Sequence, residues 1–168
     1  MPLNLLKKYN QLLELDLLNA IQRKESLWRI FNRDIILNDN FKFQNKQINP
    51  IPKDGIIDIE RLYFHLTTVI TDKITKKREF EIERSRRLHW VKYHIDHNKT
   101  ENMLIFSVIE PEGKRTYVYD TDEKYVIVLE PLRNKNEYYL LTAYYLTNKD
   151  NKRDKILKKY KRRTIEVL

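Results

Sequence analysis

Residues 103–109 read Met-Leu-Ile-Phe-Ser-Val-Ile and are followed by Glu110-Pro111-Glu112-Gly113. The first run is apolar and rich in residues that favour strands, and the four residues after it are typical of a turn. Three similar runs follow after short polar connections, at residues 115–119, 124–129 and 138–146. Four strands with such short connections pair most simply as an antiparallel meander, with the third run, Tyr125 to Leu129, at its centre.

The chain before these strands has the spacing of helices. Apolar residues recur every three or four positions over residues 3–32, where Ser26 marks a possible break between two helices, and again over residues 56–75, with Asp58 as N-cap. A basic helix is expected over residues 76–98, and another basic helix over residues 150–161 closes the chain. Helices first and strands later predict an α+β fold with helices on one face of a four-stranded antiparallel sheet.

Residues 38–55 differ in composition from their surroundings. Asn, Asp, Gln and Lys dominate there, together with Pro50, Pro52 and the turn signal Asp54-Gly55. The pattern predicts a loop or linker. We therefore expect an N-terminal helical appendage (residues 1–37), a linker (38–55) and a functional domain (56–168).

Composition excludes several classes of protein. Among 168 residues there is no cysteine, so disulfides and thiolate metal sites are ruled out, and two glycines are too few for a glycine-rich phosphate loop. No run of about 20 apolar residues could span a membrane, and the N-terminus lacks the basic-then-apolar order of a signal peptide. We expect a cytoplasmic protein with no membrane partner and no cofactor.

The formal net charge of +9 is concentrated in two places. Residues 148–168 contain nine Lys/Arg and three Asp/Glu, and residues 73–92 contain eight and three. These two segments account for all of the excess positive charge. A local basic patch favours a polyanionic partner, although a lysine-rich solvated surface would have the same composition.

The basic segment from Glu83 to Ile95 has the composition of a phosphate-binding face. On a regular helix, Arg84, Arg87 and His94 lie near the apolar stripe of Leu88 and Val91. Cations beside such a stripe must be paired or face a groove, and arginines in a groove suit a phosphate. The alternative is that Arg84 and Arg87 pair with Glu81 and Glu83, and that the tyrosines of residues 138–145 are ordinary strand aromatics.

The histidines, His65, His89, His94 and His97, limit the chemistry. His94 and His97 could share a helical face as two metal ligands, but no third ligand follows at a recognisable spacing, so no metal site is expected. His65 sits between Leu62 and Val69, a pattern more typical of a packed or rim histidine than of a catalyst. No serine lies in an elbow-like turn.

Metal-free cleavage of RNA fits the residues that remain. The ribose 2′-hydroxyl attacks its own phosphate, so the protein needs only cations and a proton acceptor. Arg87, His89 and His94 could supply these on the basic helix. Thr142 and Tyr144, two apart on one strand, could add hydroxyl groups from one face of the sheet.

The second half of the chain also resembles a known superfamily. Arg84, Arg87, Leu88, Trp90 and Val91 form an Arg-x-x-Arg-Leu-x-Trp-Val segment, followed by the strands Tyr125 to Leu129 and Leu140 to Tyr145. This arrangement resembles the phage-associated branch of the barnase, EndoU, colicin-type and RelE-like endoribonucleases, over roughly residues 56–163. The N-terminal helices lie outside the resemblance.

The resemblance implies a toxin or prophage effector that cleaves RNA, such as tRNA or mRNA, to 2′,3′-cyclic phosphate ends without a metal. Arg87 would hold the scissile phosphate, His89 or His94 would act as acid or base, and Thr142 and Tyr144 would orient the phosphate or the leaving group. Such a toxin implies an acidic antitoxin or immunity protein as partner. RNA-backbone contacts are expected from Arg84, Lys92, Lys158, Lys159, Arg162 and Arg163. The alternative function is a non-catalytic nucleic-acid-binding accessory protein of a phage or mobile element.

Overall fold

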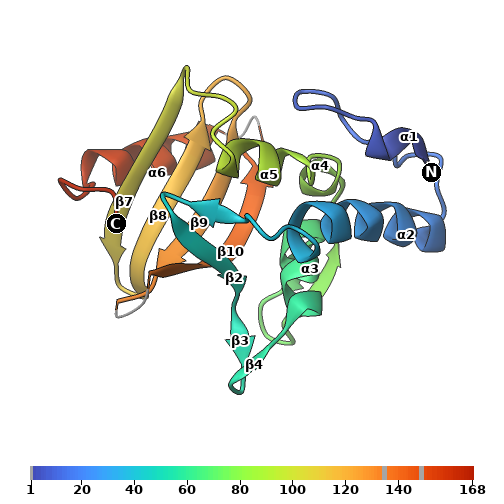
Figure 1. Ribbon diagram of the computed structural model, residues 1–168, viewed down its shortest axis with the longest axis horizontal. Helices are drawn as coiled ribbons and strands as arrows, with labels where there is room; N and C mark the ends of the chain where they lie inside the picture. The colour runs from blue at the N-terminus through green and yellow to red at the C-terminus, as the bar shows by residue number, and fades with distance from the viewer. Residues whose placement is uncertain (1, 134–135, 148–149) are drawn as a thin grey trace.

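The computed structural model describes residues 2–133, 136–147 and 150–168 and has the α+β architecture that the sequence predicts. Helices lie beside and behind one large curved sheet (Figure 1). The helices are α1 (Pro2–Leu5), α2 (Ala20–Phe31) with a π-helical turn η1 (Asn32–Ile36), α3 (Ile59–Thr67), α4 (Ile82–Ser85), α5 (Trp90–Ile95) and α6 (Asp150–Lys161). The strands are β1 (Lys42–Phe43), β2 (Lys46–Pro50), β3 (Pro52–Lys53), β4 (Ile56–Ile57), β5 (Thr68–Asp72), β6 (Lys77–Phe80), β7 (Met103–Glu110), β8 (Gly113–Asp120), β9 (Tyr125–Pro131) and β10 (Glu137–Tyr145).

The main sheet has six strands in the order β1-β2-β10-β9-β8-β7. The four predicted strands, β7 to β10, pair antiparallel with their neighbours in sequence. The prediction of a four-stranded antiparallel sheet is nevertheless wrong, because β2 adds to β10 in parallel and β1 pairs with β2. These two strands lie in the segment expected to be a linker. Their polar sequence conceals them, since β2 buries only Ile48 in its five residues.

The central strand β9 separates two hydrophobic cores. Tyr125, Ile127 and Leu129 pack with the N-terminal elements, whereas Val126 and Val128 point to the opposite face and pack with Ile156 of α6 and its neighbours. The helices therefore cover both faces of the sheet. Figure 1 shows α6 behind the sheet and α2 to α5 on its other side and edge.

The predicted helix over residues 56–75 is shorter in the structure. It begins after Asp58, whose side chain accepts a hydrogen bond from the Arg61 backbone N–H, and ends at Thr67. Residues 67–71 are all β-branched, which disfavours a helix and favours a strand, so the chain continues as β5. The β5–β6 hairpin, residues 68–80, takes up the end of this predicted helix.

The predicted basic helix over residues 76–98 is also interrupted. Its first residues form β6, and the rest are divided between the short helices α4 and α5. Glu81 caps α4 by accepting hydrogen bonds from the backbone N–H groups of Glu83 and Arg84. Because the segment is not one continuous helix, its cations do not share one face.

The N-terminal segment is integrated into the main core. The predicted helix over residues 3–32 is reduced to α1 and α2, and α2 begins with a capping box formed by Asn19 and Gln22. Leu27, Ile30 and Phe31 of α2 belong to the same buried cluster as β9 and β10. The N-terminal segment and the sheet therefore share one hydrophobic core.

Candidate nucleic-acid interface

Three of the predicted site residues lie close together at the edge of β10: Arg84, Thr142 and Tyr144. The Arg84 guanidinium Nη1 lies 3.3 Å from Thr142 Oγ1, and its Cζ lies 6.0 Å from the centre of the Tyr144 ring. β2 pairs only with residues 137–140 of β10, so α3 and α4 flank the later part of the strand. Burial raises the pKa of Tyr144 to about 12, so its hydroxyl remains protonated.

Arg84 and Thr142 attach the last turn of α3 to the sheet. Arg84 Nη1 donates hydrogen bonds to the backbone oxygens of His65 (2.8 Å) and Thr68 (3.1 Å), and Thr142 Oγ1 donates to the His65 oxygen at 3.2 Å. A cation at the carbonyl end of a helix satisfies free acceptors and complements the helix dipole. The two side chains thus fix the position of His65.

Arg87 is buried beside the sheet and already has partners. Its Nη1 lies 2.9 Å from Glu83 Oε2 and 2.6 Å from the Glu83 backbone oxygen. Its guanidinium carbon lies 3.8 Å from the centre of the Tyr145 ring. These contacts match the pairing with Glu83 that the sequence left open as an alternative, and they hold α4 against β10.

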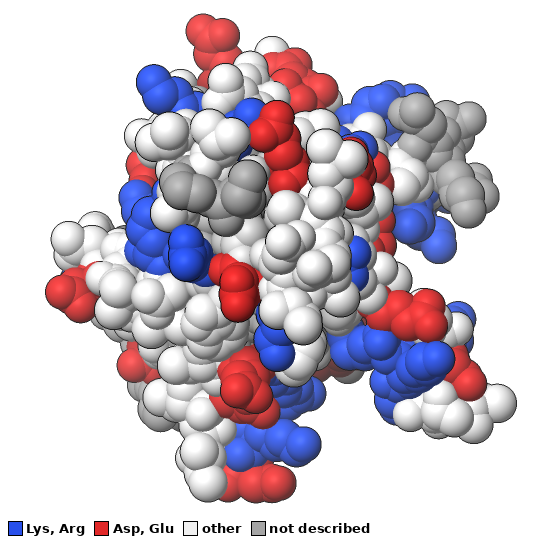
Figure 2. Space-filling view, turned by 90° about the vertical axis from the view of Figure 1, so that its right-hand side faces the viewer, with Lys and Arg blue, Asp and Glu red and all other residues white. Residues whose placement is uncertain are grey.

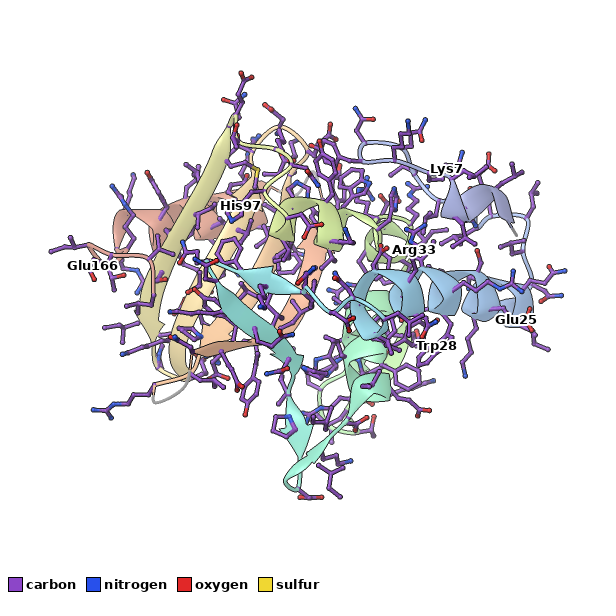
Figure 3. The ribbon with its side chains drawn as sticks, in the orientation of Figure 1. Lys7, Glu25, Trp28, Arg33, His97 and Glu166 are labelled. Atoms are coloured by element: carbon purple, nitrogen blue, oxygen red, sulfur yellow. The ribbon has the colours of Figure 1, made fainter. Side chains whose placement is uncertain are left out.

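His89 and Lys92 lie away from this group, next to the N-terminal segment. His89 Nε2 donates to the Lys8 backbone oxygen at 3.0 Å, and burial lowers the pKa of His89. Lys92 forms an ion pair with Asp96. Both line a groove with Lys7 and Arg33. Figure 3 labels Lys7 and Arg33 on the right-hand part of the molecule. In the structure, His89 contacts the N-terminal segment at Lys8.

His94 lies in the core. Its Nδ1 is 2.7 Å from the Trp90 backbone oxygen and its Nε2 is 2.8 Å from Asp120 Oδ2, so each nitrogen faces an acceptor. The side chain is fully enclosed. A catalytic base needs access to substrate, which His94 lacks in this arrangement.

The C-terminal residues predicted to contact RNA lie on α6 and just after it. This helix packs on the face of the sheet opposite to α3 and α4. Lys159 lies 2.5 Å from Glu110 Oε1 and 3.0 Å from the Tyr117 hydroxyl. Arg162 approaches Glu110 at 4.0 Å, and Arg163 stacks on the Tyr160 ring. Lys158 is exposed. These residues are separate from the Arg84–Thr142 group.

A basic groove that the sequence did not reveal lies between α3 and the β5–β6 hairpin. It has a volume of about 610 Å³. Its lining combines one histidine, four cations, one aromatic ring and two acids: His65, Lys53, Arg61, Lys76, Arg78, Phe64, Asp58 and Glu60, with Thr68. Arg61, Phe64, His65 and Thr68 are three, four and seven apart, so they share one face of α3 and its continuation.

His65 lines this groove, and one of its ring nitrogens has no hydrogen-bond partner among the described residues. Its Nδ1 lies 3.3 Å from the Leu141 backbone oxygen, which can only accept, so Nδ1 carries the hydrogen and the neutral ring has its lone pair on Nε2. No described residue donates a hydrogen bond to Nε2. Burial, together with Arg78, Arg61 and Arg84, lowers the pKa of His65 below its usual value of about 6.5. The ring is therefore an unprotonated base at neutral pH.

Among the cations around His65, Arg84 has a carboxylate nearby, with its Nε 3.9 Å from Glu81 Oε2. Arg78 donates to both the backbone oxygen and the hydroxyl of Thr68, and Arg84 donates to the same backbone oxygen. Burial and the nearby Arg61 lower the pKa of Arg78. In the part of the chain that the structure describes, no ion pair engages Lys53, Arg61, Lys76 or Arg78. Such a cluster is complementary to a phosphate.

The surface next to the groove is also basic. Figure 2 shows the β5–β6 hairpin as a protrusion at the lower right, on which Lys and Arg side chains gather. Its exposed cations are Lys73, Lys76 and Lys77, of which Lys77 pairs with Glu79 at 3.3 Å. The acids at the groove are Asp58, which is already engaged as the α3 N-cap, and the exposed Glu60. The groove therefore keeps a positive balance.

The remaining histidine, His97, does not join His94. Its ring stacks on Phe43 with centroids 4.9 Å apart, and Figure 3 shows it near β1. Over residues 2–133, 136–147 and 150–168, no three His, Asp or Glu side chains are grouped so that they could hold a metal ion.

Comparisons with protein-family models, curated protein sequences and solved structures gave no match. Within the described ranges, no helix has the length and apolar character needed to cross a membrane.

Proposed function

We propose that the protein is a metal-independent endoribonuclease that uses the groove between α3 and the β5–β6 hairpin. One observation carries this proposal: the half-buried His65 has a free Nε2, a lowered pKa and three neighbouring arginines. A base that is unprotonated at neutral pH, placed beside Arg61 and Arg78, which lack carboxylate partners among the described residues, has the groups needed to cleave a phosphodiester.

The reaction needs no nucleophile from the protein. His65 Nε2 takes the proton of a ribose 2′-hydroxyl, the 2′-oxygen forms a bond to the adjacent phosphorus, and the bond from phosphorus to the 5′-oxygen breaks. Water supplies the proton to the departing 5′-oxygen, and the products are a 2′,3′-cyclic phosphate and a 5′-hydroxyl. Arg61 and Arg78 stabilise the negative charge that develops on the phosphate.

Arg84 and Thr142 act in this proposal as positioning residues. Both hold the backbone oxygen of His65, and Leu141 next to Thr142 holds its ring. The imidazole is therefore fixed relative to the sheet from two directions. A base held in this way needs little reorganisation when substrate binds.

Cleavage of total RNA in the presence of EDTA tests the proposal. We expect fragments with 2′,3′-cyclic phosphate ends, and at least a ~100-fold lower rate for His65→Ala, the usual minimum for loss of a general base. His97→Asn is the matched control, because His97 is an exposed histidine with a positive φ of 57° that asparagine tolerates. It should retain full activity.

The pH dependence gives a second readout. Because His65 must be unprotonated and its pKa is lowered, kcat/KM should stay constant down to about pH 6.5 and fall only below it. Intact RNA combined with salt-sensitive binding would contradict the proposal and favour a non-catalytic nucleic-acid-binding protein.

A further inference from the structure

Phe64 is an exposed aromatic side chain at the rim of the basic groove. Its side chain is 43% exposed, and it is the only exposed Phe, Tyr or Trp among the residues that the structure describes. The other aromatic rings are buried or half-buried. Its ring meets Tyr63 edge-on with centroids 5.8 Å apart, which leaves ring surface open to solvent.

Phe64 lines the same groove as the cations. Phe64 precedes His65 and follows Arg61 by one helical turn on α3, and all three line the same groove. A stacking platform beside a row of cations is the arrangement that proteins use to bind unpaired nucleotides, because the ring holds a base while the cations hold the backbone.

We propose that the groove binds single-stranded RNA, with one unpaired base stacked on Phe64 and the adjacent phosphate held by Arg61 and Arg78. This inference rests on the proposed ribonuclease function and names its substrate class. In a duplex the bases are already stacked and offer no face to Phe64, so the ring favours only unpaired RNA. Lys76 and Lys77 on the hairpin extend the basic surface along the strand.

The chemistry of the site agrees with this choice of substrate. Attack by a 2′-oxygen requires it to lie opposite the departing 5′-oxygen, and the nucleotide must turn out of helical stacking to reach that geometry. A base held by Phe64 next to His65 keeps one nucleotide in an unstacked conformation. Binding and positioning are thus provided by neighbouring residues of one helix.

Fluorescence anisotropy with labelled RNA tests the inference without depending on cleavage. His65→Ala serves as the background, so that RNA stays intact, and a 12-nucleotide single strand is compared with a blunt duplex of the same length. We expect the single strand to bind at least ten times more tightly. Adding Phe64→Ala should weaken single-strand binding by about five- to a hundredfold, whereas Phe64→Tyr should retain it.

The controls separate stacking from general effects. Ile109→Ala removes another exposed apolar side chain, 65% exposed and located on β7, and should change the affinity for neither RNA. Equal affinity for both RNAs, or unchanged binding in Phe64→Ala, would overturn the inference. If wild-type protein leaves RNA intact but the single-strand preference and the Phe64 effect hold, the ribonuclease proposal fails and the binding inference stands.

Discussion

Polar contacts from several parts of the chain converge on Asp120. It is completely buried at the end of β8 and accepts hydrogen bonds from the Tyr9 hydroxyl (2.5 Å), His94 Nε2 (2.8 Å) and Lys99 Nζ (2.5 Å). Its Oδ1 also accepts from the backbone N–H groups of Asp122 and Glu123. One carboxylate therefore joins the N-terminal segment, α5 and the sheet.

Replacing this carboxylate should be strongly destabilising. Burial alone would raise the pKa of Asp120, but the hydrogen bonds from His94, Lys99 and Tyr9 outweigh it and hold the pKa well below the usual range. We expect Asp120→Asn to lower the free energy of unfolding by about 3–5 kcal/mol at pH 7, the usual cost of removing one partner from a buried charge pair. Urea unfolding measures this difference.

The pH dependence of the free energy of unfolding follows from the lowered pKa of Asp120. A depressed carboxyl pKa contributes stability above the unfolded-state pKa of about 3.9, and this contribution is lost as the pH falls further. The difference between wild type and Asp120→Asn should therefore shrink below about pH 4. Asp122→Asn, which removes an exposed neighbour that also contacts Lys99, should have a much smaller effect. A constant difference down to pH 2 would contradict this account.

The roles predicted for the histidines depend on their neighbours in the sequence, and these neighbours do not show which side chains the ring nitrogens contact. His89 and His94 stand in a basic segment, but their ring nitrogens bind Lys8, Trp90 and Asp120, which lie elsewhere in the sequence or one turn back. His65 has an apolar helical context, yet it faces a groove. The pattern of residues 61, 64, 65 and 68 could have indicated a polar face on α3, but its relation to Arg78 depends on the hairpin.

At the level of elements, strands were predicted well where both faces are buried. β7 to β10 each contribute side chains to both hydrophobic clusters, so each strand contains an apolar or aromatic run in its sequence. Short edge strands are harder to recognise, since β1 and β2 bury only Phe43 and Ile48. The end of α3 was readable from the β-branched residues 67–71, which break a helical period that the apolar spacing alone continues.

The hairpin of β1 and β2 should behave as part of the core. Phe43 is completely buried and packs edge-on against Tyr138 of β10, with ring centroids 5.9 Å apart. We expect Phe43→Ala to lower the free energy of unfolding by about 3–5 kcal/mol, because it leaves a large cavity. Ile74→Ala, at a site 93% exposed in the β5–β6 turn, should change it by less than about 0.5 kcal/mol. Equal effects in chemical denaturation would contradict the integration of this hairpin.

At the scale of the whole molecule, the two basic segments have different surroundings. The C-terminal helix lies on one face of the sheet, where Glu110 engages Lys159 and Arg162. The cations of residues 73–78 lie beside the groove on the other side of β10, and Arg61 and Lys53 add to them from outside the segment. Net charge predicts an anionic partner, but the location of the proposed groove is visible only in the tertiary structure.

Residues 1–37 should be required for the stability of the rest of the chain. The sequence suggested that residues 1–37 are an appendage, yet Leu15, Leu27, Ile30 and Phe31 are almost completely buried in the core shared with the sheet. Burying each such side chain contributes about 1.5–3 kcal/mol, and a domain of this kind is stable by only about 5–15 kcal/mol in total. We therefore expect residues 38–168 alone to lack a cooperative thermal transition by near-ultraviolet circular dichroism, and a separate 1–37 fragment to restore it when added in excess. Removal of residues 1–37 also removes Leu13, so the core loses five buried hydrophobic side chains and should lose its stability. A sharp transition for residues 38–168 alone, at the temperature of the full chain, would instead show that the N-terminal segment is an appendage.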